Sequence, residues 1–289
     1  VWHQDPAGFK DRINKYLAVS GRHGIKTIFV LFDDCWHDNP KPGKQPDPQQ
    51  GVHNSGWVKG PGTKALKDQT QWGRLEAYVK DILGAFGEDD RVVIWDLYNE
   101  PGNNFLISLK LPAVLRFAIL IGKLVKHLLV SGPTKRLLVQ AFSWAREVNP
   151  RQPLTAGLYF LRPFLGAKLN PVCLELSDIV SFHSYFNLEE TEKIVADLSK
   201  SRRPMVCTEY MARNAGSTFE AVMPYFKNHK IGAINWGLVA GKTQTIYSWE
   251  DYYPNGEEPP LWFHDILRPD GSPYRQEEKA LIQELTHEM

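Results

Sequence analysis

The stretch Ile94–Pro101, IWDLYNEP, is an apolar segment that ends abruptly in Asn99 and Glu100. A buried β-strand does not normally finish with a carboxylate unless that group faces a cleft. A second apolar stretch, Pro204–Tyr210 (PMVCTEY), ends in the same way at Glu209. The carboxyl ends of parallel strands meet at one edge of a sheet, so the two glutamates are predicted to face each other across the mouth of a barrel.

Around these two segments the sequence alternates between apolar, β-branched runs and helical patterns. The predicted strands are Lys26–Asp34, Arg91–Asn99, Pro153–Phe160, Ile179–Tyr185, Pro204–Glu209 and Gly232–Val239. The predicted helices are Pro6–Arg22, Thr70–Phe86, Thr134–Val148, Leu188–Arg202, Thr218–His229 and Gln276–His287. Nearly continuous apolar strands suit a parallel sheet covered on both faces. The alternation therefore predicts a parallel α/β fold.

Composition narrows the choice of fold and partner. The chain has 289 residues, and a (β/α)₈ barrel needs roughly 250, so we expect a single domain over residues 1–289. Lys and Arg number 34 against 33 Asp and Glu, a balance that disfavours a nucleic-acid partner. Cys35, Cys173 and Cys207 are too scattered for a disulfide framework, and we expect them to be free, with Cys207 buried in a strand. His37 and His53 lack a third ligand at convincing spacing, so no metal or cofactor is predicted.

The segment 105–131 is an unusual insertion rich in hydrophobic and basic residues. Lys110, Arg116, Lys123 and Lys126 interrupt it, so it holds no uncharged run of the ~20 residues that a membrane-spanning helix needs. Its basic residues gather on one arc of a helical wheel, which predicts an amphipathic surface helix packed on the domain. A helix that touches a membrane surface or a partner through residues 105–130 is the alternative.

The polar residues at strand ends predict a site for glycoside hydrolysis. That chemistry needs two carboxylates, of which one stays protonated as the acid while the other is ionised as the nucleophile. Hydrogen bonds from His183 and Tyr185, which share one side of a strand, would create that asymmetry. Asn99 would bond a sugar hydroxyl, and Trp236 would lie under the sugar ring.

Other residues are predicted to lie at the same face of the fold. Further substrate contacts are expected from the strand end at Asp34 and Trp36 and from the loop residues His53, Trp57, Lys242 and Trp249. The tryptophans Trp72, Trp95 and Trp144 are expected in the core. The long loop of residues 35–69 follows a strand end, where the active sites of barrels lie.

The motifs together resemble the clan A retaining glycoside hydrolases, the cellulase and β-glycanase group that includes glycoside hydrolase family 5. In that clan an Asn-Glu pair ends the fourth barrel strand, and a second glutamate ends the seventh. The resemblance rests on Asn99-Glu100-Pro101, His183-Ser184-Tyr185, Thr208-Glu209-Tyr210 and Trp236, in that order, and runs over roughly residues 5–287.

The resemblance implies a (β/α)₈ barrel and retaining hydrolysis of a β-linked oligo- or polysaccharide, without a cofactor. Glu209 would be the nucleophile and Glu100 the acid/base. Retention implies a separation of about 5–5.5 Å between the two carboxyl groups. The sugar and its linkage stay open, as do exo or endo action and the oligomeric state. The chemistry favours an extracellular or periplasmic location.

The chain departs from the family pattern in two ways. The strand that ends at Glu100 is only the second visible strand, so the first two βα units are expected to be missing upstream of Val1. No residue matches the arginine that usually holds the nucleophile in this clan. The alternatives are therefore a carbohydrate-binding pseudoenzyme or fragment that lacks full activity, and a transglycosidase that uses the same residues.

Overall fold

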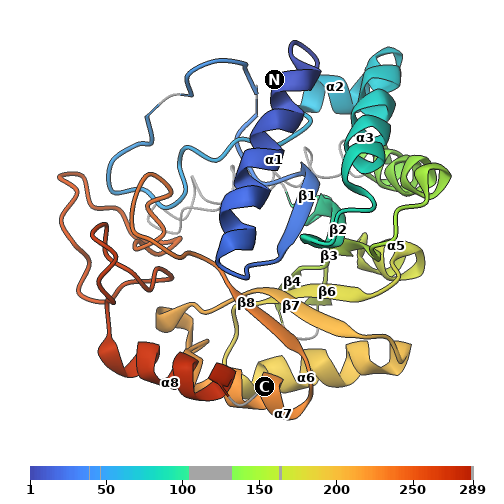
Figure 1. Cartoon of the computed structure of the whole chain (residues 1–289). Helices are drawn as coiled ribbons and strands as arrows, with labels where there is room; N and C mark the ends of the chain where they lie inside the picture. The colour runs from blue at the N-terminus through green and yellow to red at the C-terminus, as the bar shows by residue number, and fades with distance from the viewer. Residues whose placement is uncertain (39, 46, 104–131, 163–164, 288–289) are drawn as a thin grey trace, which may run out of the picture.

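The computed structural model describes residues 1–38, 40–45, 47–103, 132–162 and 165–287 (Figure 1). The predicted insertion 105–131 lies outside the described residues. Among the described helices, none has the length and apolar character needed to cross a membrane.

Six parallel strands form the centre of the molecule. They are β1 (Thr27–Asp33), β2 (Val92–Asn99), β3 (Leu154–Gly157), β6 (Val180–Ser184), β7 (Met205–Tyr210) and β8 (Gly232–Asn235). The strand orders are β1-β2-β3 in one sheet and β6-β7-β8 in the other. A parallel bridge between Leu158 and Phe182, with hydrogen bonds of 3.1 and 2.8 Å, continues the pairing from the first sheet to the second.

Helices connect and cover the strands (Figure 1). The longer ones are α1 (Pro6–Arg22), α3 (Trp72–Phe86), residues 132–148, α6 (Leu188–Leu198), α7 (Phe219–Asn228) and α8 (Gln276–His287). The short ones are α2 (Thr63–Lys67), α5 (Asn170–Leu176) and the 3₁₀ turns η1 (Gln69–Gln71), η2 (Ser199–Ser201) and η3 (Arg213–Ala215). The Asp5 side chain caps α1 by accepting from Gly8 N, and Pro6 occupies the first turn, where its missing N–H is not needed.

All six predicted strands and all six predicted helices are present among the described residues, which do not show a full barrel. The described strands form two three-stranded parallel sheets, with β1 and β8 at the outer edges. The sequence reading did not predict α2, α5 or the antiparallel hairpin β4 (Phe160–Arg162) and β5 (Leu165–Gly166), because each is too short to show a period.

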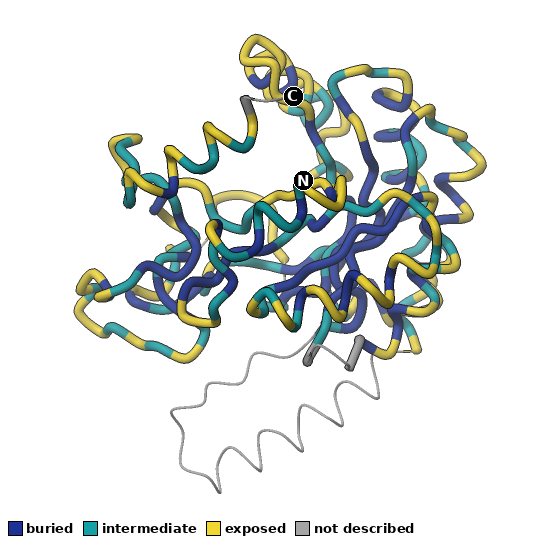
Figure 2. Tube along the Cα trace, turned by 90° about the horizontal axis from the view of Figure 1, so that it is seen from below, coloured by how far each residue is buried: buried dark blue, intermediate teal, exposed yellow. Residues whose placement is uncertain are grey.

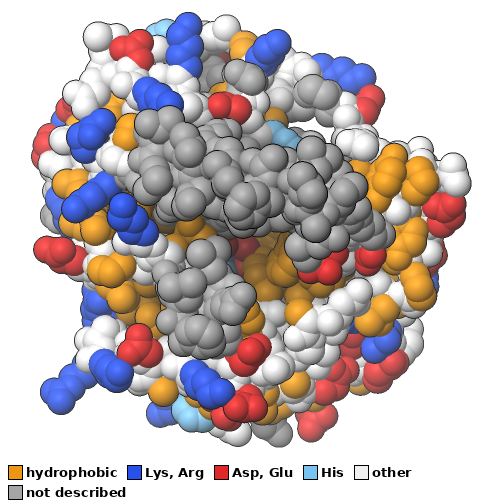
Figure 3. Space-filling view, turned by 180° about the vertical axis from the view of Figure 1, so that it is seen from behind, with side chains coloured by type: hydrophobic (Ala, Val, Ile, Leu, Met, Phe, Trp, Pro, Cys, Tyr) orange, Lys and Arg blue, Asp and Glu red, His pale blue; other side chains and the backbone are white. Residues whose placement is uncertain are grey.

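The hydrophobic core lies between the sheets and the helices. Figure 2 shows buried residues along the central strands and exposed residues on the outer sides of the helices. Trp95 and Trp144 are buried in this core, and Trp72 packs against it with its ring in edge contact with Trp144, as predicted. On the face in Figure 3, hydrophobic side chains are visible in a central hollow, with basic and acidic side chains around it.

Strand register brings the polar ends of the strands to one level. Asp33 on β1 pairs with Asn99 on β2, which in turn pairs with Gly157 on β3. In the second sheet His183 on β6 pairs with Glu209 on β7. Parallel strands all end at the same edge, so these side chains meet in one cavity.

Candidate active site

A cavity of about 370 Å³ opens at the carboxyl ends of the strands. All but one of the ten predicted site residues line it: Glu100, Glu209, Asn99, His183, Tyr185, Trp236, Trp36, His53 and Trp249. Its size is within the range of small-molecule sites in proteins.

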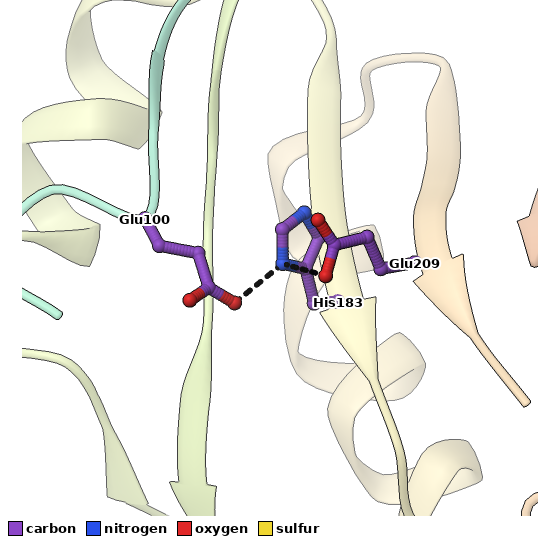
Figure 4. A group of neighbouring side chains, drawn as sticks. All are labelled: Glu100, His183 and Glu209. Carbon is purple, nitrogen blue, oxygen red and sulfur yellow. Dashed lines mark hydrogen bonds and ion pairs between the residues drawn. The ribbon is translucent and has the colours of Figure 1, made fainter. Parts of the chain in front are cut away.

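Glu100 and Glu209 meet at one imidazole nitrogen (Figure 4). Nδ1 of His183 lies 2.6 Å from Oε1 of Glu100 and 3.3 Å from Oε2 of Glu209. Each of the three side chains has a nitrogen or oxygen atom within 4.8 Å of the others. The imidazole on β6 therefore contacts the carboxyl groups that follow β2 and end β7.

The backbone at Glu100 adopts an unusual conformation. Its φ is 43°, in the left-handed region that non-glycine residues rarely occupy, and its N–H donates to the carbonyl of Gly157 at 3.1 Å. A Cβ atom at Gly157 would lie 3.1 Å from Oδ1 of Asn99 and 3.2 Å from Nε2 of His183. Glycine at this position therefore lets the three strand ends approach closely.

The carboxylate of Glu100 is held by three side chains. His183 contacts Oε1, while the thiol of Cys35 donates to Oε2 at 3.1 Å and the amide of Asn103 donates to the same oxygen. Burial alone would raise the pKa of Glu100, but the positive charge of His183 and these hydrogen bonds hold it below its usual value. Glu100 is therefore ionised at neutral pH.

Glu209 has fewer partners. The phenol of Tyr185 donates to Oε2 at 2.6 Å, and His183 is the cation beside it. Burial raises the pKa of Glu209 to about 8 against the lowering effect of His183, and the charge of Glu100 raises it further. Burial would lower the pKa of His183, but the charges of Glu209 and Glu100 raise it to about 9. The free site therefore carries a protonated imidazole and a protonated Glu209.

The roles that the sequence predicts for the two glutamates stay predictions, and in the free site the pKa of Glu100 is lowered while that of Glu209 is raised. Glu100, assigned as the acid, is the ionised partner, and Glu209, assigned as the nucleophile, keeps the proton. The two carboxyl groups differ in their partners. The charged imidazole of His183 lies closer to Glu100, whereas Glu209 accepts a hydrogen bond from the neutral phenol of Tyr185.

Aromatic rings form much of the cavity wall. The rings of Trp57 and Trp236 are in edge contact, with centroids 5.5 Å apart, and those of Tyr185 and Trp249 are in edge contact at 5.1 Å. The ring of His53 stands beside Trp249, with centroids 6.1 Å apart. Flat apolar faces beside a few polar groups suit a ring-shaped polar ligand.

Asp34 does not line the cavity. Its side chain is fully buried and accepts from the Tyr98 hydroxyl, Gly102 N and the Thr134 hydroxyl at 2.9, 2.7 and 3.0 Å. The carboxylate that faces the cavity belongs to Asp33, one residue earlier. Side chains alternate along a strand, so an error of one residue exchanges the two faces.

Asp33 joins two walls of the cavity. Its carboxylate accepts from the indole N–H of Trp57 at 3.0 Å and from the backbone N–H of Cys35 at 2.7 Å. Burial raises the pKa of Asp33 to about 6 despite these bonds, and the charge of Glu100 adds to the shift. The sequence does contain a signal for Asp33. Like Asp34, it is a carboxylate at the end of an apolar strand, one position earlier.

The remaining loop residues divide between the cavity and the surface. Trp57 lines the cavity, whereas the Lys242 side chain is 85% exposed and lies 3.9 Å from Asp47. Sequence reasoning missed these further lining residues: Cys35, Asn54, Asn103, Tyr159, Phe160, Phe186, Ala215 and Glu250. Phe160 begins β4, and the others lie on connections after strands, where periodicity gives no signal.

The three cysteines are free, as predicted, and all three are buried. Cys207 lies in β7, and Cys35 lies in the connection after β1.

Among the described residues one group could also hold a metal ion. It consists of Glu100, His183 and Glu209, the same three side chains described above. In this arrangement the protonated imidazole of His183 supplies the positive charge between the carboxyl groups. The sequence predicts no metal site at His37 and His53, because a third ligand at suitable spacing is missing. His37 is exposed and does not line the cavity.

Comparison with known proteins gives matches to solved structures only. A β-glucuronidase from an uncultured Clostridium species has a TM-score of 0.49 and 12% identity, over 96% of this chain and 42% of that one. A GH2 β-galacturonidase from Eisenbergiella tayi has a TM-score of 0.48 and 9% identity, over 78% and 38%. A β-glucuronidase from Ruminococcus gnavus has a TM-score of 0.47 and 14% identity, over 78% and 37%.

Two of these three structures are described as β-glucuronidases and one as a GH2 β-galacturonidase. The chain spans less than half of the length of each of these three proteins. No protein-family model and no curated protein matches it. The narrower family 5 resemblance stays a prediction.

Proposed function

We propose that the chain hydrolyses β-glycosidic bonds with retention of configuration, using Glu209 as the nucleophile and Glu100 as the acid/base. The observation that supports this most is the meeting of the two strand-end glutamates at His183, with side-chain atoms within 4.8 Å, inside an aromatic cavity. A short separation of the carboxyl groups suits double displacement, because inversion needs about 6.5–9.5 Å to admit a water molecule.

In the proposed first step, an oxygen of Glu209 bonds to the anomeric carbon while Glu100 gives its proton to the leaving oxygen. In the second step, Glu100 removes a proton from water, and that water displaces Glu209 from the sugar. Asn99, which is nearly buried at the end of β2, is proposed to bond a sugar hydroxyl, and Trp236 to support the ring.

The proton must reach Glu100 before the first step. His183 Nδ1 contacts both carboxyl groups, so this imidazole can give its proton to Glu100 and receive the one held by Glu209. The imidazole of His183 then has the same charge as before. The one proton shared by the glutamates has moved from Glu209 to Glu100. This transfer needs no other group.

The test is covalent trapping with mechanism-based glycosidase inhibitors of several sugar configurations, followed by intact-mass and peptide mass spectrometry. One inhibitor should give a one-to-one adduct on Glu209, and the Glu209→Gln variant should stay unlabelled. An adduct on Glu100 would keep double displacement but exchange the two roles. A folded protein that is labelled by none of the inhibitors and cleaves no β-glycoside would refute the proposal.

A carbohydrate-binding protein without turnover is the second candidate. The raised pKa of Glu209 favours it, because a protonated carboxyl is a poor nucleophile. It would bind the sugar inhibitor without forming an adduct. A transglycosidase would instead form the same adduct and pass the sugar to an alcohol, so product analysis with an added acceptor separates it from a hydrolase.

We also propose that the six strands belong to a (β/α)₈ barrel and that residues 1–289 form one domain. Support comes from the order of the strands, each beside the next in sequence, and from the position of the cavity at their carboxyl ends. A crystal structure of the ligand-bound protein that showed both edges unpaired would contradict this architecture.

A further inference from the structure

Two loops that lie far apart in the sequence are joined beside the cavity. One follows β1 and includes residues 49–55, and the other follows β8 and includes residues 243–256 (Figure 1). Among the described strands, β1 and β8 are the outer strands of the two sheets and are not paired with each other. The contact between these loops therefore links the two sheets at the cavity on the side where strand pairing does not.

The side chain of Gln244 lies at the centre of this loop junction. Its Oε1 accepts from Gly51 N at 2.9 Å. Its Nε2 donates to the carbonyl of Gln49 at 2.7 Å, and the Val52 carbonyl and Ser55 Oγ each lie 3.3 Å from the same nitrogen. Because a glutamine amide both donates and accepts, this one side chain holds the loop after β1 at several points.

Backbone contacts strengthen the loop junction. Asn54 N donates to the carbonyl of Thr243 at 2.9 Å, and Tyr253 N donates to the carbonyl of Gly51 at 3.1 Å. A Cβ atom at Gly51 would lie 1.7 Å from the carbonyl oxygen of Tyr253, and the φ of Gly51 is 72°. Only glycine fits this position without strain, so the close approach of the loops depends on it.

Residues of both loops line the cavity next to the loop junction. His53 and Asn54 come from the loop after β1, and Trp249 and Glu250 come from the loop after β8. Nδ1 of His53 donates to the carbonyl of Tyr247 at 2.8 Å, and the rings of His53 and Trp249 are in edge contact. This wall of the cavity therefore depends on how the two loops are held together.

The two glutamates are held separately from the loop junction. Glu100 follows β2, and Glu209 lies at the end of β7. The side-chain hydrogen bonds described above for these carboxyl groups come from neither residues 49–55 nor residues 243–256. A change at the junction should therefore alter the binding of substrate more than the chemical step.

We propose that Gln244 is a positioning residue that ties the loop after β1 to the loop after β8, and so holds His53 and Trp249 in place to contact the sugar. This inference rests on the function proposed above and adds a residue that acts on substrate only through others. An open junction would leave the wall in several arrangements, and the apparent affinity falls with the fraction that can bind. Loss of Gln244 should therefore raise KM without an equal change in kcat.

Kinetics on two glutamine variants test this role. Gln244→Ala removes the amide from the junction, so KM should rise by about three- to thirtyfold, as expected for the loss of one or two hydrogen bonds, while kcat changes by less than about twofold. Gln45→Ala is the matched control, because the Gln45 amide donates to the carbonyls of Lys41 and Gly43 within its own loop, and its KM should not change. An unchanged KM in Gln244→Ala, or a loss confined to kcat, would overturn the inference.

Two glycine variants test the junction from the other loop. Gly51→Ala places a methyl group against the carbonyl of Tyr253 and should raise KM as Gln244→Ala does. Gly56→Ala is the matched control, because its new Cβ would lie 3.5 Å from the nearest atom, in Pro48, and its KM should not change. Thermal unfolding verifies that both variants are folded. Equal KM values for the two variants would contradict a role of the junction in binding.

Hydrogen exchange of the free protein measures the junction without any substrate. In Gln244→Ala the backbone amides of residues 49–55 and of residues 243–256 should exchange about tenfold faster, whereas those of β6 and β7 should exchange as in the unmodified protein. Unchanged exchange in residues 49–55 would show that Gln244 does not hold the loop after β1, and would overturn the inference.

Exchange and kinetics together keep the two proposals distinguishable. Cleavage of a β-glycoside with the same KM in Gln244→Ala and the unmodified protein refutes the inference and leaves the glycosidase function standing. Faster exchange in both loops, with no cleavage and no labelling by any inhibitor, refutes the proposed function, and the role of Gln244 in substrate binding falls with it. A raised KM together with faster exchange in both loops supports both proposals.

Discussion

Tyr185 donates a hydrogen bond of 2.6 Å to Oε2 of Glu209, and its ring stands in edge contact with Trp249. This phenol is the closest hydrogen-bond donor that the described residues give to Glu209. We predict that Tyr185→Phe raises the pKa of Glu209 further, because a bond that favours the ionised form is lost. A hydrogen bond to a charged group is worth about 1.5–3 kcal/mol, so kcat/KM should fall by about ten- to hundredfold.

The control for this variant is Tyr225→Phe on α7, whose ring packs beside His229 outside the cavity. Both variants remove one phenolic oxygen, and only Tyr185→Phe should lose activity. Circular dichroism and thermal unfolding verify that both are folded. Equal kcat/KM values for Tyr185→Phe and the unmodified protein would show that the phenol does not act on Glu209.

The glutamate pair should set the pH dependence of activity. The reaction needs one proton on the pair, and the pair holds one proton between the lowered pKa of Glu100 and the pKa of about 8 at Glu209. Above pH 8 both carboxyl groups are ionised and the acid is missing. We therefore predict a broad profile of kcat/KM that falls on the alkaline side near pH 8. A fall that begins near pH 5 would contradict the shared proton.

Stability should fall as the pH rises, and Asp96 contributes to this. Burial raises the pKa of Asp96 from 3.8 to about 7, so the folded protein keeps a proton that the unfolded chain loses within that window. The free energy of unfolding should then drop by about 1.4 kcal/mol per pH unit from this group as the pH rises from 4 to 7.

Urea unfolding at pH 5 and pH 7.5 measures this effect. Asp96→Asn removes the titrating group, so its loss of stability between the two pH values should be smaller than that of the unmodified protein. Asp11→Asn, on the exposed side of α1, is the control and should keep the full pH dependence. An identical pH dependence in Asp96→Asn would show that Asp96 is ionised in the folded protein.

The cysteine thiols should be inert in the folded protein. Burial raises the pKa of Cys35, Cys173 and Cys207, and the neutral thiol is a poor nucleophile. Iodoacetamide at pH 8 should therefore add no group to the native protein and three after denaturation. Rapid alkylation of Cys35 in the native protein would contradict its burial beside Glu100.

The regular elements of this fold could be predicted because they are long and periodic. The bounds predicted for α1 and α8 agree with the structure, and every predicted strand overlaps an observed one. The position of Glu100 and Glu209 in the cavity could also be predicted, because a carboxylate at the end of an apolar strand is unusual. Short elements such as α2 and the β4–β5 hairpin leave no period in the sequence, and tertiary contacts define them.

The division of hydrogen bonds within the site could not be predicted. Whether His183 binds Glu100 or Glu209 more closely depends on strand register, which shifts between Phe182 and His183. That choice decides which carboxyl group is ionised. The partner of a buried carboxylate such as Asp34 likewise depends on the fold, since Thr134 lies 100 residues away in the sequence.

Asp33 and Asp34 are neighbours in the sequence, and we predict that they have different roles. Asp34 is fully buried, and it joins the hydroxyls of Tyr98 and Thr134 to the backbone after Glu100. Lys59, also buried, lowers its pKa against the effect of burial. Asp34→Ala should therefore cost about 3–5 kcal/mol of the free energy of unfolding, as expected when one partner of a buried network is removed.

Asp33→Ala should affect substrate binding more than stability, because the side chain of Asp33 points to the opposite face of the strand from that of Asp34. Asp33 faces the cavity, where water can replace part of its bonding to Trp57, so the free energy of unfolding should change by less than about 2 kcal/mol. Its loss should instead raise KM. Chemical unfolding and kinetics on the two variants separate the roles. A large loss of stability in Asp33→Ala with little in Asp34→Ala would reverse the assignment of the two side chains.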